Sequence, residues 1–246
     1  MKKILLVYNP VSGSAVFRKK LDAIIESLQR RKMLPVLYRT RAENSVEEFF
    51  ECVKISDLEK YFDSIAENRT RPIDLGLVNG EEFFINVASA GVFTSIAHEV
   101  DSRQKNALGK IAYYLHGLGE LPKFKTVELE VKADGKIYCL EAFLFLVLNS
   151  PSVAGMKKIT DAAKIDDGRL DFLALKKSSP RKLLNLTQKL LAGKCVNSDQ
   201  NVFYLQAKTF EINSSSDLIS DLDGEIGDHL PIKVETVRNA LNFFVN

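Results

Sequence analysis

The side chains best suited to acid–base chemistry lie close together in SDLDGEIGDHLP, residues 220–231. Four carboxylates fall between Asp221 and Asp228, and Gly224 and Gly227 interrupt them. A carboxylate at the end of a strand can take a proton from an alcohol and so act as a general base. The same letters also fit a solvated turn, because Asp-Gly is a common hairpin signal. This stretch alone leaves both interpretations open.

A second acidic stretch, DAAKIDDGRLDFLAL, covers residues 161–175 and places Asp166, Asp167 and Asp171 around Gly168. Hard divalent cations prefer oxygen ligands, and a turn here can offer the Asp167 side chain together with backbone carbonyls. A charged turn that leads into the strand LDFLAL explains the same residues equally well. The local pattern therefore does not decide between a metal site and a turn.

The third candidate is NPVSG, residues 9–13, which separates an apolar strand from a helical pattern. Backbone N–H groups and the Ser12 hydroxyl could receive an anion there, because the N-terminal end of a helix carries partial positive charge. Asn, Pro, Ser and Gly are also common where a strand turns into a helix. This motif indicates a nucleotide-binding site only in combination with other motifs.

The elements around NPVSG predict a βαβ unit. Residues 2–8 and 33–39 are apolar strands, and the helix between them has one apolar face made of Phe17, Leu21, Ile24, Ile25 and Leu28. Because such crossovers are right-handed, the two strands should be parallel, with ligands at their C-terminal ends.

From about residue 71 the pattern changes to strands. Asn79-Gly80 and Asp134-Gly135 each predict a hairpin between apolar runs. Helices are expected over 108–122 and 179–194, and the last strands over 202–212, 217–222 and 232–245. We therefore predict an α/β plus β protein, with an N-terminal Rossmann-like α/β domain at 1–70 and a C-terminal antiparallel β-sandwich-like domain at 71–246.

Composition narrows the functional classes. The 246 residues are 46% hydrophobic and carry a net charge of only +2. The chain as a whole therefore lacks the excess of positive charge that is typical of nucleic-acid-binding proteins. Cys52, Cys139 and Cys195 show neither a disulfide nor a zinc pattern, and the N-terminus lacks signal-peptide features, so we expect a cytoplasmic protein. Short basic runs such as Lys176-Lys177 are usually solvated, although they can also favour an anionic membrane surface.

Five stretches taken together resemble one family. NPVSG, RPIDLGLVNGEEFFINVASAG, GKIAYYLHGLGELP, KIDDGRLDFLALKK and DLDGEIGDHLPIKV occur in the order seen in bacterial diacylglycerol kinase-like lipid kinases. Members of that family are similar to NAD kinases in fold, with an α/β nucleotide-binding domain, a β-sandwich-like domain and an active site in the cleft between them. The resemblance extends over nearly all of the printed sequence.

The resemblance implies an ATP-dependent kinase that transfers the γ-phosphate to a lipid alcohol such as diacylglycerol. The implied site residues are Glu225 as general base with Asp223 close by, Asn9, Ser12 and Thr40 around the nucleotide, and, for a structural Mg²⁺, the Asp167 side chain with the carbonyls of Lys164 and Arg169. The expected partners are ATP, the lipid and, transiently, the inner membrane face, with no nucleic acid; a homodimer is compatible with the sequence.

The sequence departs from the family at residues 56/57. It lacks the Gly-Gly-Asp-Gly-Thr loop that holds the ATP phosphates, and the Gly-Thr-x-Asn-Asp-Phe-type loop after it. We expect that an internal segment is missing between Ser56 and Asp57, which leaves the N-terminal domain truncated. The alternatives are an inactive pseudo-kinase that binds lipid or acts as a scaffold, and a kinase for another lipid alcohol such as sphingosine.

Overall fold

The computed structural model describes residues 2–8, 16–39, 62–91, 126–153 and 158–244. By its internal contacts the chain separates into two units, Met1–Pro72 with Asn242–Asn246, and Ile73–Leu241. Each unit is described by itself. The seam at Ser56 and Asp57 and the helix expected over 108–122 lie outside the described residues, and the domain ranges 1–70 and 71–246 stay a prediction.

The first unit contains the predicted βαβ arrangement. Strands β1 (Lys2–Tyr8) and β2 (Met33–Arg39) pair in parallel, from Lys2 opposite Met33 to Tyr8 opposite Arg39. Helix α1 (Val16–Arg30) connects them and buries Ile24 and Leu28 against Met33 and Phe62. The sequence pattern was sufficient here, because the 3.6-residue apolar period alone determines which helix face is buried.

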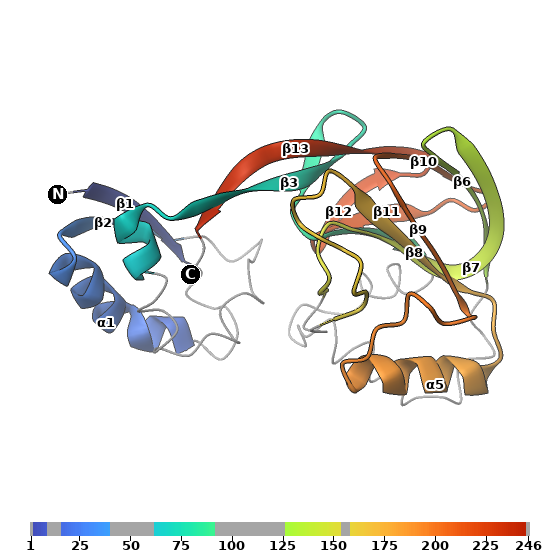
Figure 1. The fold of residues 1–246 in the computed structure, drawn as a ribbon, viewed down its shortest axis with the longest axis horizontal. Coiled ribbons are helices and arrows are strands. Elements are labelled where there is room, and N and C mark those ends of the chain that lie inside the picture. Colours follow the sequence, from blue (N-terminus) through green and yellow to red (C-terminus); the bar gives the residue numbers. More distant parts are fainter. Residues whose placement is uncertain (1, 9–15, 40–61, 92–125, 154–157, 245–246) are drawn as a thin grey trace. The chain divides into compact units, whose positions relative to one another are not determined.

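The second unit is a largely antiparallel β structure (Figure 1). Hydrogen bonds order its strands β12-β11-β5-β7-β6-β10-β13-β3-β4, and β8 joins β7 to β9. The strand bounds are β3 Thr70–Val78, β4 Glu82–Phe84, β5 Val87–Gly91, β6 Val127–Ala133, β7 Lys136–Leu148, β8 Leu170–Lys176, β9 Val202–Ala207, β10 Thr209–Ser214, β11 Ile219–Leu222, β12 Glu225–His229 and β13 Ile232–Phe244.

Strand β7 belongs to two layers. Its first half pairs with β6, whereas its second half lies between β5 and β8. The main apolar core draws residues from strands of both layers. The ring of Phe172 lies between those of Phe145 and Phe210, with centroid distances of 5.6 Å and 5.8 Å. This two-layered core confirms the predicted β-sandwich-like fold.

A second apolar layer lies beneath helix α5 (Pro180–Leu191). Leu186 and Leu190 of this helix pack on residues of β7, β8 and β9, including Leu148, Leu173 and Val202. The helix begins after Ser179 with Pro180 in its first turn, as predicted, because proline fits a position whose N–H needs no intrahelical partner.

Both predicted hairpins form, and Asp223-Gly224 is the turn of a third. Asn79, Asp134 and Asp223 all have positive φ, as do the glycines that follow them. Asp134-Gly135 and Asp223-Gly224 are two-residue connections, which require this geometry, whereas three residues lie between Val78 and Glu82 in the first hairpin. The single strand expected over 202–212 is wrong. It divides at Lys208, because β9 pairs with β8 whereas β10 pairs with β6 and β13. No helix among the described residues is long and apolar enough to cross a membrane.

Candidate active site

The Asp-Gly-Glu turn joins β11 to β12. Leu222 is paired with Glu225 across the hairpin, so Asp223 and Gly224 form a two-residue connection. The N–H of Gly224 donates to the Asp221 carboxylate at 3.0 Å, which closes the turn. Glu225 is the first residue of β12 and is exposed to solvent. The turn therefore presents one carboxylate at a fixed place on the end of a sheet.

Asp223 has a different environment from Glu225. Its carboxylate accepts three backbone hydrogen bonds, from the N–H groups of Ile85 (2.6 Å), Val87 (2.8 Å) and Asn86 (3.0 Å). Its own N–H donates to the Val87 carbonyl at 2.9 Å. A carboxylate held by several N–H donors is strongly oriented. Asp223 thus anchors the turn to residues 85–87.

Asn149 continues this network into the interior. It is fully buried, and its Nδ2 donates to the carbonyl oxygens of Asp74 (2.7 Å) and Ile85 (2.8 Å). Its backbone N–H donates to the carbonyl of Asn86 at 2.9 Å. Asn149 therefore connects the segment that holds Asp223 to strand β3.

Asp74 in turn supports the second predicted site, the Asp-Asp-Gly turn. Its buried carboxylate accepts from the N–H groups of Gly168 (2.6 Å) and Asn239 (2.8 Å). Its N–H donates to the Ile165 carbonyl at 2.8 Å. Asp167 itself is exposed, and its Oδ1 accepts from the N–H of Arg169 at 3.0 Å.

The two predicted turns therefore share one hydrogen-bonded support, which runs from Asp223 through residues 85–87, Asn149 and Asp74 to Gly168. Asp74 and Asn149 were not among the predicted site residues. Their positions in the sequence could have indicated them, because Asp74 is the single acid within the apolar run of β3 and Asn149 directly follows the apolar run of β7. Buried polar groups need partners, so such residues mark places where a network must exist.

Asp171 is a buried acid just after the Asp-Asp-Gly turn. Burial raises the pKa of Asp171 to about 6, although hydrogen bonds from Tyr204 and Gln206 to its Oδ1 act to lower that pKa. Within the described part of the chain, its Oδ2 is buried without a hydrogen-bond partner. The raised pKa reflects this incomplete solvation of the charged form.

The donor set for a cation is limited. Among the described residues, no three His, Cys, Asp or Glu side chains come together as a metal site. Asp167 and the backbone carbonyls of Lys164 and Arg169 belong to the same turn before β8, and a hard ion such as Mg²⁺ accepts one carboxylate with carbonyls and waters. This chemistry fits Mg²⁺ without a cluster of acids.

The nucleotide residues predicted from the sequence, Asn9, Ser12 and Thr40, lie outside the described residues. His229, which has no metal pattern in the sequence, is exposed, and its Nδ1 lies 2.7 Å from Asp217 Oδ1. The described site therefore consists of the two turns and the network between them.

Comparison with known sequences agrees with this fold. The sequence model of the YegS C-terminal NAD kinase beta sandwich-like domain matches residues 86–245. A diacylglycerol kinase of Bacillus subtilis (strain 168) is 37% identical over 175 residues, which cover 71% of this chain and 57% of the relative. A diacylglycerol kinase of Staphylococcus aureus (strain JH9) is 30% identical over 233 residues, covering 94% of this chain and 72% of the relative.

Solved structures with similar folds come from the same group and from NAD kinases. A Bacillus anthracis (strain Sterne) crystal structure, provisionally described as a diacylglycerol kinase, superimposes with a TM-score of 0.78 and 21% identity, covering 100% of this chain and 95% of the other. An NAD kinase from Archaeoglobus fulgidus in complex with ATP gives a TM-score of 0.53 and 11% identity, covering 100% and 94%. At these identities the likeness concerns the fold alone.

Proposed function

Because this chain belongs to the bacterial diacylglycerol kinase-like family, we propose that it acts as a lipid kinase, which transfers the γ-phosphate of ATP to the hydroxyl of a lipid alcohol such as diacylglycerol. The relatives that carry the name diacylglycerol kinase support this class of reaction. The observation that carries the proposal is the anchored turn, which fixes Asp223 and leaves the Glu225 carboxylate exposed.

In the proposed reaction Glu225 acts as the general base. Its carboxylate takes the proton from the lipid hydroxyl while the hydroxyl oxygen attacks the γ-phosphorus, and the bond to the β-phosphate oxygen breaks to release ADP. Asp223 keeps the base in place, because its three backbone hydrogen bonds prevent the turn from shifting. Rigid support matters since small displacements of a catalytic group are costly in rate.

The nucleotide and the metal complete the proposal. Asn9, Ser12 and Thr40 would border ATP, and the Asp167 carboxylate with the carbonyls of Lys164 and Arg169 would hold Mg²⁺. A bound Mg²⁺ would supply a fixed positive charge beside the Asp-Asp-Gly turn. Gly168, whose N–H is bonded to Asp74, keeps that turn in one conformation. We further propose a cytoplasmic protein that contacts the inner membrane face transiently.

The test measures phosphate transfer from labelled ATP to diacylglycerol in detergent–lipid mixed micelles, with ATP binding followed separately by calorimetry. Glu225→Gln should lower turnover by about a hundred- to ten-thousandfold, as expected for loss of a general base. Glu82→Gln, an exposed glutamate on β4, is the matched control and should leave turnover within a few-fold.

Turnover by Glu225→Gln close to that of the original chain would remove Glu225 from the base role. A chain that binds lipid but neither binds ATP nor transfers phosphate would instead be the pseudo-kinase that the absent Gly-Gly-Asp-Gly-Thr loop allows. Faster phosphorylation of sphingosine than of diacylglycerol would support the proposed reaction but show that the substrate is a different lipid alcohol.

A further inference from the structure

Arg238 of β13 lies against the Asp-Asp-Gly turn. A Cβ built on Gly168 would be 2.9 Å from Nε of Arg238, 3.0 Å from its Cδ and 3.4 Å from its Cζ. The arginine side chain therefore crosses Gly168 at a distance that a side chain at position 168 would prevent. Gly168 also has a φ of 74°, which favours glycine. The turn thus provides both the backbone conformation and the space that this arginine needs.

The backbone on both sides of this contact is fixed by Asp74. The buried carboxylate of Asp74 accepts from the N–H of Gly168 at 2.6 Å and from the N–H of Asn239, which follows Arg238, at 2.8 Å. One carboxylate therefore holds both partners of the contact. Because Asn149 connects Asp74 to the support of the Asp-Gly-Glu turn, the same network orients the arginine and the proposed general base.

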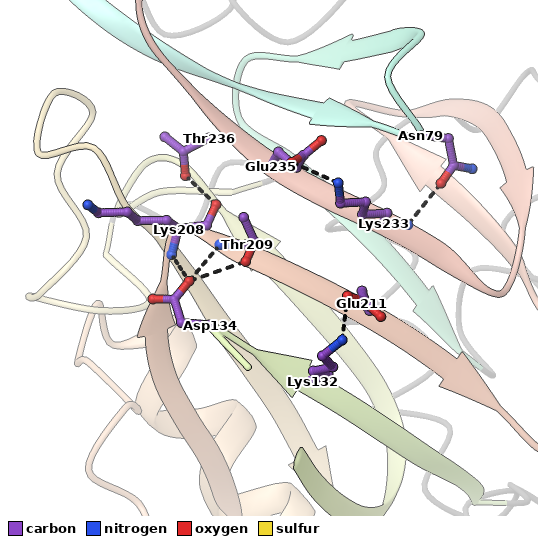
Figure 2. A network of polar contacts seen from close by, with 9 residues as sticks. All are labelled: Asn79, Lys132, Asp134, Lys208, Thr209, Glu211, Lys233, Glu235 and Thr236. Carbon is purple, nitrogen blue, oxygen red and sulfur yellow. Dashed lines mark hydrogen bonds and ion pairs between the residues drawn. The ribbon is translucent and has the colours of Figure 1, made fainter. Parts of the chain in front are cut away.

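The guanidinium of Arg238 has no partner. Its side chain is exposed, and within the part of the chain that the structure describes it makes no hydrogen bond or ion pair. By contrast, Figure 2 shows Lys233 of the same strand paired with Glu235 at 2.9 Å. Asp167, which precedes the glycine, accepts instead from the N–H of Arg169. The five N–H donors of Arg238 are therefore available to a ligand.

We propose that Arg238 binds the phosphoryl group that is transferred, first as the γ-phosphate of ATP and then as the phosphate of the lipid product. This inference rests on the proposed function and adds a residue to it. A guanidinium suits the task because its planar fork matches two phosphate oxygens and it stays charged. Arg238 only donates hydrogen bonds, and the proton of the lipid hydroxyl still goes to Glu225.

The charges around Gly168 favour an anionic ligand of this kind. Asp167 and Arg169, the residues on either side of the glycine, are proposed ligands of Mg²⁺. Two cationic groups beside one turn repel each other, and an anion that contacts both offsets this repulsion. A phosphoryl group in transfer carries negative charge on three oxygens, and kinases neutralise that charge with cations. The terminal phosphate is therefore the best match.

A purely structural role of Arg238 is the alternative. Arginine stems often cover a surface while the guanidinium stays in water. Arg238→Gln distinguishes the two roles, because glutamine keeps much of the stem over Gly168 but removes the charge. A structural role predicts a small change in unfolding free energy and no change in affinity for phosphate ligands.

The test measures binding of three ligands by calorimetry, in one buffer with Mg²⁺. The ligands are ATP, ADP and dioctanoyl phosphatidate below its micelle concentration. Arg238→Gln should weaken ATP and phosphatidate binding by about ten- to a hundredfold, the size of charge-assisted hydrogen bonds. ADP binding should weaken by less than about threefold, because ADP lacks the transferred group.

Two further variants make the comparison specific. Arg238→Lys keeps the charge without the planar fork, so its affinities for ATP and phosphatidate should lie between those of the original chain and Arg238→Gln. Arg181→Gln removes an exposed arginine from α5 and is the matched control, which should bind all three ligands like the original chain. Urea unfolding checks that each variant is folded.

The outcomes separate this inference from the proposed function. An original chain that binds ATP, with Arg238→Gln binding it equally well, would overturn the role of Arg238 and leave the kinase proposal in place. Equal weakening of ATP and ADP would also overturn that role, since the contact would then be to another phosphate. Arg238-dependent binding of phosphatidate without any ATP binding would support the phosphate site and contradict the kinase. Binding of neither ligand would overturn both.

Discussion

Nδ2 of the buried Asn149 donates to the backbone carbonyl of Asp74 at 2.7 Å, and this one contact joins the supports of two separate acidic turns. The same amide of Asn149 also donates to the carbonyl of Ile85, and the N–H of Ile85 donates to the carboxylate of Asp223. The carboxylate of Asp74 accepts a hydrogen bond from the N–H of Gly168. The two Nδ2 bonds of Asn149 form only when both turns have their observed conformation, whereas its buried Oδ1 has no hydrogen-bond partner among the described residues.

Replacing Asn149 should therefore destabilise the second unit. Asn149→Ala removes both Nδ2 hydrogen bonds and leaves the buried carbonyl of Asp74 and the partly buried carbonyl of Ile85 without these partners, which costs about 1–3 kcal/mol of unfolding free energy. Urea denaturation followed by circular dichroism measures this change. Asn213→Ala, an exposed asparagine on β10, is the control and should change stability by at most about 0.5 kcal/mol. A loss no larger than that of the control would show that Asn149 supports neither turn.

The two Asp-Gly turns at Asp134 and Asp223 provide a comparison between stability and activity. Both aspartates have positive φ, and both carboxylates accept hydrogen bonds from the backbone of a neighbouring segment. Asp134→Asn and Asp223→Asn keep a residue that tolerates this conformation, but each loses charge-assisted hydrogen bonds, at about 1–2 kcal/mol. Thermal unfolding should show a similar loss for both variants.

Only Asp223→Asn should also impair phosphate transfer, by about tenfold or more, because only this turn carries Glu225. The measurement is turnover in the micelle assay at a temperature where both variants are fully folded. Equal activity of the two variants would show that the position of Glu225 does not depend on Asp223. A rescue of Asp223→Asn by low temperature alone would point to stability as the whole effect.

Local patterns in the sequence were sufficient for those elements whose chemistry is contained within a few residues. The turn at Asn79-Gly80 and the start of α5 at Ser179-Pro180 follow from backbone preferences that do not depend on the rest of the chain. The Asp-Gly-Glu turn likewise forms at the position that the sequence predicts. Its three carboxylate hydrogen bonds, however, come from residues 136 to 138 positions away.

Long-range relationships were the part that the sequence did not reveal. Asp74 contacts Gly168 and Asn239, which are 94 and 165 positions away, and no periodicity connects them. The break at Lys208 has the same origin, since the local apolar pattern continues through it and only the choice of partner strands divides β9 from β10. Pairing of distant strands overrides local propensity in such cases.

The buried Asp171 should make stability depend on pH. Its folded-state pKa, raised by burial to about 6, lies above the ordinary value of 3.8, so the folded chain binds a proton more tightly than the unfolded chain. The contribution of this group is therefore fully present below about pH 4 and is lost as the pH rises to about 6. The difference corresponds to roughly 3 kcal/mol.

Comparison of the original chain with Asp171→Asn isolates this effect from other titrating groups. Urea unfolding between pH 4 and 7.5, in EDTA to exclude divalent cations, should show that the original chain loses stability relative to the variant as the pH rises, by up to roughly 3 kcal/mol. A stability difference that stays constant over this range would show that Asp171 titrates normally in the folded state.

The last prediction concerns Gly76 and Phe84, which are opposite each other in the β3–β4 hairpin. A Cβ placed on Gly76 would lie 2.0 Å from Cζ of the buried Phe84 ring, so Gly76→Ala forces the ring out of its site. Overpacking of this kind costs about 1–3 kcal/mol. Because Phe84 precedes Ile85 and Asn86, whose N–H groups hold Asp223, phosphate transfer should fall as well.

A double-mutant cycle distinguishes this clash from a general weakening of the hairpin. Phe84→Leu alone removes ring contacts and costs stability by itself, but it also removes the ring atoms that an alanine at position 76 would meet. Gly76→Ala/Phe84→Leu should therefore lose clearly less unfolding free energy than the sum of the single variants, by about 1 kcal/mol or more. Additive losses in urea denaturation would show that the ring and the glycine do not interact, and that the close contact does not fix the segment behind Asp223.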